Sequence, residues 1–212
     1  MSDARTEMLS RIRTALGTST PEATSVPREY RAAGEHAAGS AEVLEVLVDR
    51  LVDYKAHVHQ VAAADLPGLL AELLGPGSVV VPPGIDAAWL AGLAEVEVRT
   101  DSREAPLSAV ELDGIDAVVT AARVAVAETG TIVLDGEPDQ GRRAISLVPD
   151  VHVCVVRTDQ VVQTVPEAVR LLDADPGRPL TWISGPSATS DIELDRVEGV
   201  HGPRTLHVAL VS

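Results

Sequence analysis

Short runs of β-branched and small apolar residues alternate with stretches of helical periodicity, and this alternation constrains the fold most strongly. Residues 78–81 read Ser-Val-Val-Val, and similar apolar runs occupy residues 117–120, 151–156 and 206–211. Aromatic residues make up only 2% of the chain and Phe is absent, so Val, Leu, Ile and Ala must fill the core. Strands that alternate with helices form βαβ units. The sequence therefore predicts an α/β fold with a largely parallel sheet.

The first 39 residues differ from the rest of the chain. Residues 2–16 show the apolar spacing of an amphipathic helix that ends at Gly17. Residues 18–39 contain Pro21, Pro27 and Gly34 and have no sustained period, as expected of a flexible linker. We therefore divide the chain into an N-terminal helix and linker, residues 1–39, and one α/β domain, residues 40–212. The helix either docks on its own domain or on a partner, or forms a frayed tail.

The charge of the chain excludes several classes of partner. A formal net charge of −15 and a pI near 4.7 disfavour nucleic acid and anionic membrane surfaces, because both require clustered cations. No apolar run has the length of a signal peptide or a membrane span. We expect a cytoplasmic protein with no nucleic-acid partner and no membrane insertion.

The residues that would mark common cofactor and metal sites are missing or isolated. Cys154 is the only cysteine and lies in an apolar run, so this chain cannot supply the ligands of an iron–sulfur cluster. The only lysine, Lys55, follows a tyrosine and therefore belongs to no phosphate-binding P-loop, and no dinucleotide-binding glycine motif occurs. His57 and His59 share one side of a predicted strand, but a solvated strand face explains them. We expect no metal and no cofactor bound by this chain.

Three polar loop motifs carry the candidate chemistry, and the first spans residues 128–131. Glu128, Thr129, Gly130 and Thr131 lie between two apolar runs that are close enough to form a hairpin. Gly130 allows backbone N–H groups to turn outward toward an anion or a carbonyl oxygen. Glu128 would then act as a base or nucleophile. The alternative is an ordinary hairpin turn with a solvated Glu128.

The second motif follows the predicted strand at residues 181–183. Ligands of open α/β sheets bind at the carboxyl ends of strands, where a hydroxyl-rich loop suits a carboxylate or phosphate. The alternative is a simple helix cap. The candidate ligand-binding residues are Ser184, Gly185, Ser187, Thr189 and Asp191.

The third motif places His201 between glycines, in a loop that ends at Gly202 and Pro203. An imidazole is well suited to proton transfer near neutral pH, although a loop histidine can equally be structural or merely exposed. Arg143 would supply a cation for an acidic substrate, unless it is only solvated. We therefore predict Glu128 and His201 as catalytic residues, and the other loop residues with Arg143 as substrate-binding residues.

Four motifs in register resemble the lactate-utilisation protein C family, which is the LUD domain. They read A-E-T-G-T-I-V-L, R-x-x-S-L-V-P-x-x-H-V, I-S-G-P-S-x-T-x-D-I-E and G-V-H-G-P-x-x-L-H-V. The match is strongest from about residue 115 to residue 211. Ala188 departs from the family pattern, in which lysine is frequent, and this removes one candidate cation from the site. The resemblance implies a three-layer α/β/α fold like that of the NagB, ribose-5-phosphate isomerase and CoA-transferase group, with a mixed, mostly parallel sheet.

The resemblance also implies a role in oxidising L-lactate to pyruvate, together with partner proteins that carry iron–sulfur clusters. The chain would be a subunit or accessory factor that binds a small carboxylate. Two alternatives stay open. One is a transferase or isomerase acting on a CoA ester, a sugar phosphate or a folate, with Glu128 as nucleophile. The other is a non-catalytic assembly subunit whose N-terminal helix docks a partner.

Overall fold

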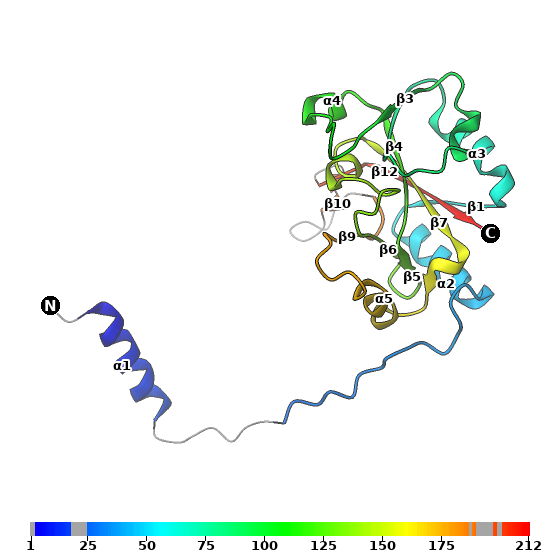
Figure 1. Cartoon of the computed structure of the whole chain (residues 1–212). Helices are drawn as coiled ribbons and strands as arrows, with labels where there is room; N and C mark the ends of the chain where they lie inside the picture. The colour runs from blue at the N-terminus through cyan, green and yellow to red at the C-terminus, as the bar shows by residue number, and fades with distance from the viewer. Residues whose placement is uncertain (1–2, 18–24, 187, 190–196, 199–200) are drawn as a thin grey trace. The chain divides into compact units, whose positions relative to one another are not determined.

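A computed structural model of the chain describes residues 3–17, 25–186, 188–189, 197–198 and 201–212 (Figure 1). The chain forms two compact units, Met1–Tyr30 and Arg31–Ser212. Within the described part of the chain, no helix is both long enough and apolar enough to span a membrane.

The first unit contains helix α1, Ala4–Leu16. The Asp3 side chain caps its first turn by accepting a hydrogen bond from the Arg5 N–H, and Gly17 follows the helix with a positive φ of 67°. The helix buries no side chain, so its apolar residues, Met8 and Ile12 among them, are exposed. The predicted N-terminal helix is therefore present and begins two residues later than expected.

The second unit is built on a six-stranded sheet with strand order β1-β12-β7-β4-β2-β3. Each neighbouring pair of strands in this sheet is parallel. This arrangement confirms the predicted α/β fold with a mostly parallel sheet. The strands are β1 (His57–Val61), β2 (Ser78–Val81), β3 (Glu97–Thr100), β4 (Ala117–Ala121), β7 (Val151–Arg157) and β12 (Thr205–Val211).

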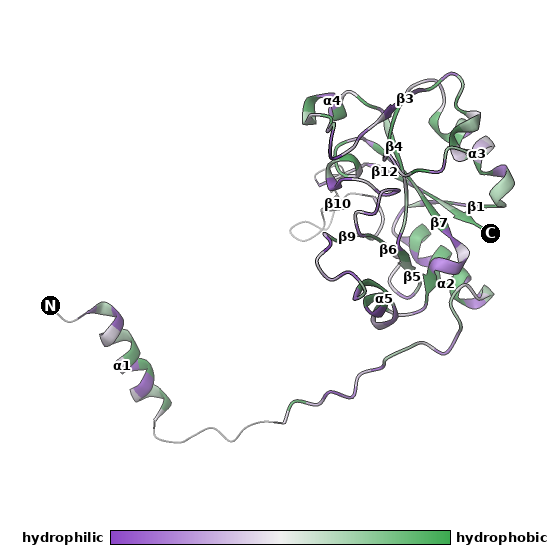
Figure 2. Cartoon of the chain, in the orientation of Figure 1, coloured by the Kyte–Doolittle hydropathy of each residue, from purple (hydrophilic) through white to green (hydrophobic). Residues whose placement is uncertain are grey.

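Both faces of this sheet are covered, which explains why its central strands β2, β4 and β7 are buried and mostly apolar. On one face, Val79, Val119 and Val153 pack against helix α3 (Leu66–Leu74). On the other face, Cys154 and Leu206 pack against helix α2 (Ala41–Asp53). Strand β12, which lies between β1 and β7, is mostly hydrophobic (Figure 2). Helix α4 (Ala109–Asp113) packs Leu112 in a separate cluster.

A second sheet of four strands, in the order β8-β5-β6-β9, adds to the layer formed by α2. The predicted hairpin forms here as the antiparallel pair β5 (Val124–Val126) and β6 (Thr131–Leu134). Strand β9 (Thr181–Ile183) pairs antiparallel with β6, and the short strand β8 (Val161–Val162) pairs parallel with β5. Helix α5 (Val165–Leu172) covers the outer face of this sheet. The segment at residues 181–183 is thus a strand, as predicted, but it belongs to the smaller sheet.

Residues 31–39 are part of the second unit. The Gly39 N–H donates to the Val161 carbonyl oxygen at 2.8 Å, and the His36 N–H donates to Gln163 Oε1 at 3.0 Å. The segment therefore runs along the smaller sheet before Ser40 caps helix α2.

Candidate functional site

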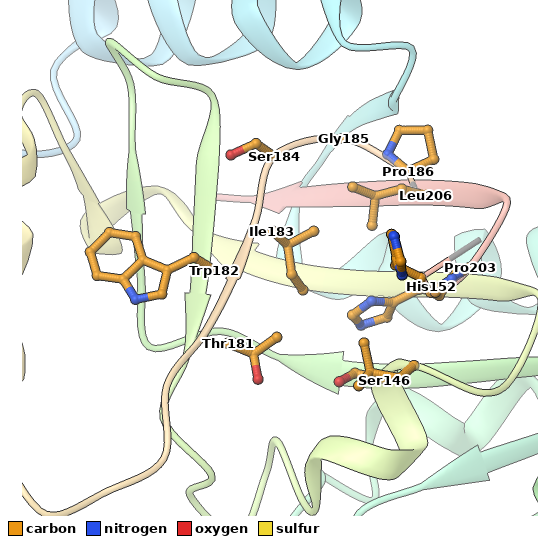
Figure 3. Close-up of a pocket in the computed structure, with 13 residues that line it drawn as sticks. Ser146, His152, Thr181, Trp182, Ile183, Ser184, Gly185, Pro186, Pro203 and Leu206 are labelled. Carbon is orange, nitrogen blue, oxygen red and sulfur yellow. The ribbon is translucent and has the colours of Figure 1, made fainter. Parts of the chain in front are cut away.

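A cavity of about 200 Å³ brings together two of the three predicted loops (Figure 3). One wall is the chain from Thr181 through Ser184 and Gly185 to Pro186, and the facing wall includes the loop from His201 to Pro203. Ser146 and Thr181 lie toward one end of the cavity, and Ser184 and Gly185 toward the other (Figure 3). Ser184, Gly185, His201 and Gly202, which were predicted separately from sequence, thus surround one space.

The position of this cavity in the fold follows from the strand directions. The loop at residues 201–203 precedes β12, and Ser146 precedes β7, so the cavity lies at the amino ends of these two parallel strands. Ser184 follows the carboxyl end of β9, as predicted, but β9 belongs to the smaller sheet. The cavity is consequently formed where an end of the large sheet meets the smaller one.

Both glycine loops abut the last turn of helix α2, and only glycine fits at these contacts. Gly185 has a φ of +81°, and a Cβ atom there would lie 2.6 Å from the Tyr54 carbonyl oxygen. Gly130 has a φ of +58°, and its Cβ would lie 2.8 Å from the Arg50 Cβ. Real Cβ atoms do not approach other heavy atoms so closely, and positive φ values are strained for other residues. The end of α2 therefore fixes the position of both loops.

A chain of three hydroxyl groups links the first loop to the cavity. Thr129 Oγ1 donates a hydrogen bond to Thr131 Oγ1 at 2.8 Å, and Thr131 Oγ1 lies 2.8 Å from Ser184 Oγ. Thr131 is buried, whereas Thr129 and Ser184 are exposed. Thr131 therefore fixes the Ser184 side chain from behind without lining the cavity itself.

Replacement of Thr131 by valine is expected to lower the free energy of unfolding by about 1 kcal/mol, the net contribution of a buried hydrogen bond. Valine keeps the shape of the side chain and removes only its hydroxyl. Urea denaturation would measure the change. Thr100→Val is the matched control, because Thr100 is an exposed strand residue and should change stability by less than about 0.5 kcal/mol. Equal effects of the two variants would contradict the role assigned to Thr131.

Glu128 and His201, the two predicted catalytic residues, are not brought together. Glu128 does not line the cavity; its carboxylate forms an ion pair with Arg31 and accepts a hydrogen bond from Gln163 Nε2 at 3.3 Å. His201 is an exposed residue of the cavity wall. The geometry thus favours His201 as the residue that meets a ligand, and the catalytic role of Glu128 stays a prediction.

The other predicted residues are distributed as follows. Arg143 begins a short 3-10 helix, Arg143–Ser146, and lines a second cavity beside the first. Ser187 and Asp191 lie outside the described residues. Thr189 belongs to strand β10 (Ala188–Thr189), which pairs antiparallel with β11 (Val197–Glu198).

His152 lines the cavity and was not singled out from the sequence. It is buried in β7, and its Nε2 atom lies 2.8 Å from the Thr120 hydroxyl on the neighbouring strand β4. Burial lowers the pKa of His152 to about 4, so the ring is neutral at neutral pH. The sequence feature that could have identified His152 is its place in the motif R-x-x-S-L-V-P-x-x-H-V. This motif also contains Ser146, which lines the same cavity.

Metal-binding candidates are limited in the part of the chain that the structure describes. His207 joins the predicted pair, since its Nδ1 lies 3.1 Å from His59 Nε2 and its ring stacks on His57 with centroids 4.9 Å apart. Even so, no group of three or more His, Cys, Asp or Glu side chains among the described residues could hold a metal ion. Burial raises the pKa of the Cys154 thiol to about 12, which keeps it protonated.

The fold and the cavity define a class of protein, an α/β domain with a cavity between a parallel sheet and a smaller mixed sheet. Residues 44–211 match the model of the LUD domain. The chain belongs to the LUD domain family, which confirms the resemblance of its four motifs.

Individual relatives agree with this assignment. The chain is 52% identical to "Lactate utilization protein C" of Deinococcus radiodurans, over 99% of this chain and 96% of that protein. It is 34% identical to "Lactate utilization protein C" of Bacillus subtilis, over 44% of this chain and 41% of the relative. A crystal structure of a DUF162 family protein from Deinococcus radiodurans matches with a TM-score of 0.69 at 50% identity, covering 81% of this chain and 98% of that one.

Proposed function

We propose that this chain is a lactate utilisation protein that binds a small carboxylate in the cavity between Ser184 and His201. It would act in the cytoplasm in the oxidation of L-lactate to pyruvate, with partner proteins that carry iron–sulfur clusters. The observation that carries the proposal is the 52% identity, over 99% of this chain, with a protein named "Lactate utilization protein C".

The cavity supplies chemistry suited to a hydroxy acid. Ser184 and the backbone of the glycine loop at Gly185 offer hydrogen bonds to a carboxylate, and the His201 imidazole can accept the proton of the substrate hydroxyl. Oxidation of lactate to pyruvate releases two electrons and two protons. His201 would take the hydroxyl proton. The hydrogen on carbon would leave with both electrons, as a hydride, to a two-electron acceptor carried by the partner proteins, whose iron–sulfur clusters would then accept the electrons one at a time. The single cysteine of this chain is consistent with that division.

Growth on L-lactate tests the proposal. A strain that lacks the gene should grow poorly on L-lactate, and the wild-type chain should restore growth. His201→Ala should fail to restore it, because the cavity then lacks its proton acceptor. His36→Ala is the matched control, since His36 is exposed and does not line the cavity. Immunoblots should show equal amounts of each variant.

Two outcomes would contradict the proposal in different ways. Normal growth of the deletion strain on L-lactate would refute the lactate role. Full restoration by His201→Ala would refute the assigned site and leave the lactate role standing. A parallel Glu128→Ala strain tests whether that carboxylate is required although it lies outside the cavity.

A further inference from the structure

A second cavity of about 210 Å³ adjoins the first and is lined by three arginines, Arg103, Arg142 and Arg143. The two cavities share Ser146 and Thr181, so they lie on either side of one wall. No Asp or Glu is among the described residues that line the second cavity. Such a concentration of positive charge is not expected from the composition of the chain, which has 32 acidic residues and only 17 Lys and Arg residues.

Arg142 is a fixed and neutralised part of the wall. Its Nε donates to Asp101 Oδ2 at 2.8 Å, and one terminal nitrogen donates to Asp101 Oδ1 at 2.5 Å and to the Leu107 carbonyl oxygen at 3.0 Å. Asp101 is completely buried, so this two-bond pair is shielded from solvent. Arg142 therefore shapes the cavity, and its charge is balanced by Asp101.

Arg103 and Arg143, by contrast, carry positive charge that no carboxylate balances by direct contact. Both are exposed, and neither forms an ion pair with any residue in the described ranges. The attraction between Arg103 and its neighbour Glu104 is only the smallest of the causes that lower the pKa of Glu104. Two guanidinium groups are thus available to a ligand.

Two glycines line the second cavity, and one of them lies beside Arg103. Gly136 and Gly141 line the cavity with φ values of +71° and +74°. A Cβ at Gly136 would lie 3.5 Å from a terminal nitrogen of Arg103, and a Cβ at Gly141 would collide with Ile145 Cδ1 at 2.7 Å. A side chain at position 136 would therefore reduce the space beside the Arg103 guanidinium group.

We propose that this second cavity is a phosphoryl-binding subsite. A phosphoryl group carries a charge of about −1.5 to −2 and several acceptor oxygens, which two free guanidinium groups balance, whereas a single carboxylate would leave one of them unpaired. The proposal rests on the proposed function for the role of the neighbouring cavity. It adds a phosphoryl group to the small hydroxy acid of the proposed function. The phosphoryl group is either part of the same molecule or a second ligand.

Isothermal titration calorimetry with inorganic phosphate tests the subsite on the full chain, at constant ionic strength. Phosphate should bind the wild type, and Arg103→Gln and Arg143→Gln should each weaken binding at least about tenfold. Arg157→Gln is the matched control. Arg157 ends β7 at the end opposite His152, lines neither cavity, and should leave the affinity unchanged. Absence of phosphate binding, or equal binding by all variants, would overturn the proposal.

A second probe distinguishes a phosphoryl group that belongs to the same molecule as the hydroxy acid from a separate phosphate ligand. 3-Phosphoglycerate carries a carboxylate, a hydroxyl and a phosphoryl group. If one molecule spans both cavities, it should bind more tightly than phosphate and lose affinity in His201→Ala. If phosphate is a separate ligand, phosphate and 3-phosphoglycerate should bind with equal affinity, and L-lactate should bind to the phosphate-bound protein. Both results support the subsite. Because these binding measurements do not depend on growth on lactate, a failure of the proposed function can be told apart from a failure of the subsite.

Discussion

Replacing Gly185 with alanine is expected to lower the free energy of unfolding by about 2 to 4 kcal/mol. The added Cβ would lie 2.6 Å from the Tyr54 carbonyl oxygen, and the backbone φ of +81° is strained for alanine. Because the obstructing atom belongs to the backbone, rotation of a side chain cannot relieve the contact. Either the loop or the end of helix α2 must shift, so ligand binding in the cavity should weaken as well. Urea denaturation and calorimetry would measure the two effects.

Gly68→Ala is the matched control for this substitution. Gly68 lies in helix α3, has no positive φ, and a Cβ there would meet no atom within 4 Å. Alanine is the better helix former, so this variant should be more stable by up to about 1 kcal/mol. If both variants had the same midpoint of denaturation, the steric role of Gly185 would be wrong.

Acidification should destabilise the protein through His152. The pKa of this histidine is about 4 in the folded protein, where burial disfavours its charged form, and about 6.5 in the unfolded chain. Between these values the unfolded chain binds more protons, so stability is complete above about pH 6.5 and falls as the pH decreases toward 4. The difference in pKa corresponds to a loss of about 3 kcal/mol.

His152→Gln should remove this contribution, because glutamine does not titrate and its amide can still meet the Thr120 hydroxyl. Urea denaturation of both proteins at pH values from 7 to 4 gives the comparison. The wild type should lose about 3 kcal/mol more than the variant over this range. Parallel stability curves would show that His152 is hydrated or charged in the folded protein.

The sequence predicted the strands of the large sheet and helices α2, α3 and α5, but not helix α4, the two-residue strands or the assignment of the strands to two sheets. Uninterrupted valine runs such as the one in β2 predict buried parallel strands, because helices cover both faces of the sheet. Thr181–Ile183 has similar local character and yet pairs with β6, almost fifty residues earlier. Local pattern cannot specify a distant pairing partner, and in the smaller sheet only the β5–β6 hairpin, whose strands are close in sequence, was predicted.

Only part of the candidate site could be predicted from the sequence, because local pattern does not show which distant residues come into contact. The loops containing Ser184 and His201 could be recognised because glycines flank their polar residues. His152 is hidden in an apolar run, and its partner Thr120 lies 32 residues away. Glu128 was predicted to meet substrate, but its ion pair with Arg31 joins residues 97 apart and could not be seen from local spacing.

The contact of both glycine loops with the last turn of α2 has a thermodynamic consequence for binding. With no gap between Gly185 and Tyr54, or between Gly130 and Arg50, the wall beside Ser184 is ordered as soon as the protein folds. The loss of backbone entropy at these positions therefore belongs to folding and is not repeated when a ligand enters. A small ligand, which has few atoms with which to offset such a loss, gains most from a wall that is preorganised in this way.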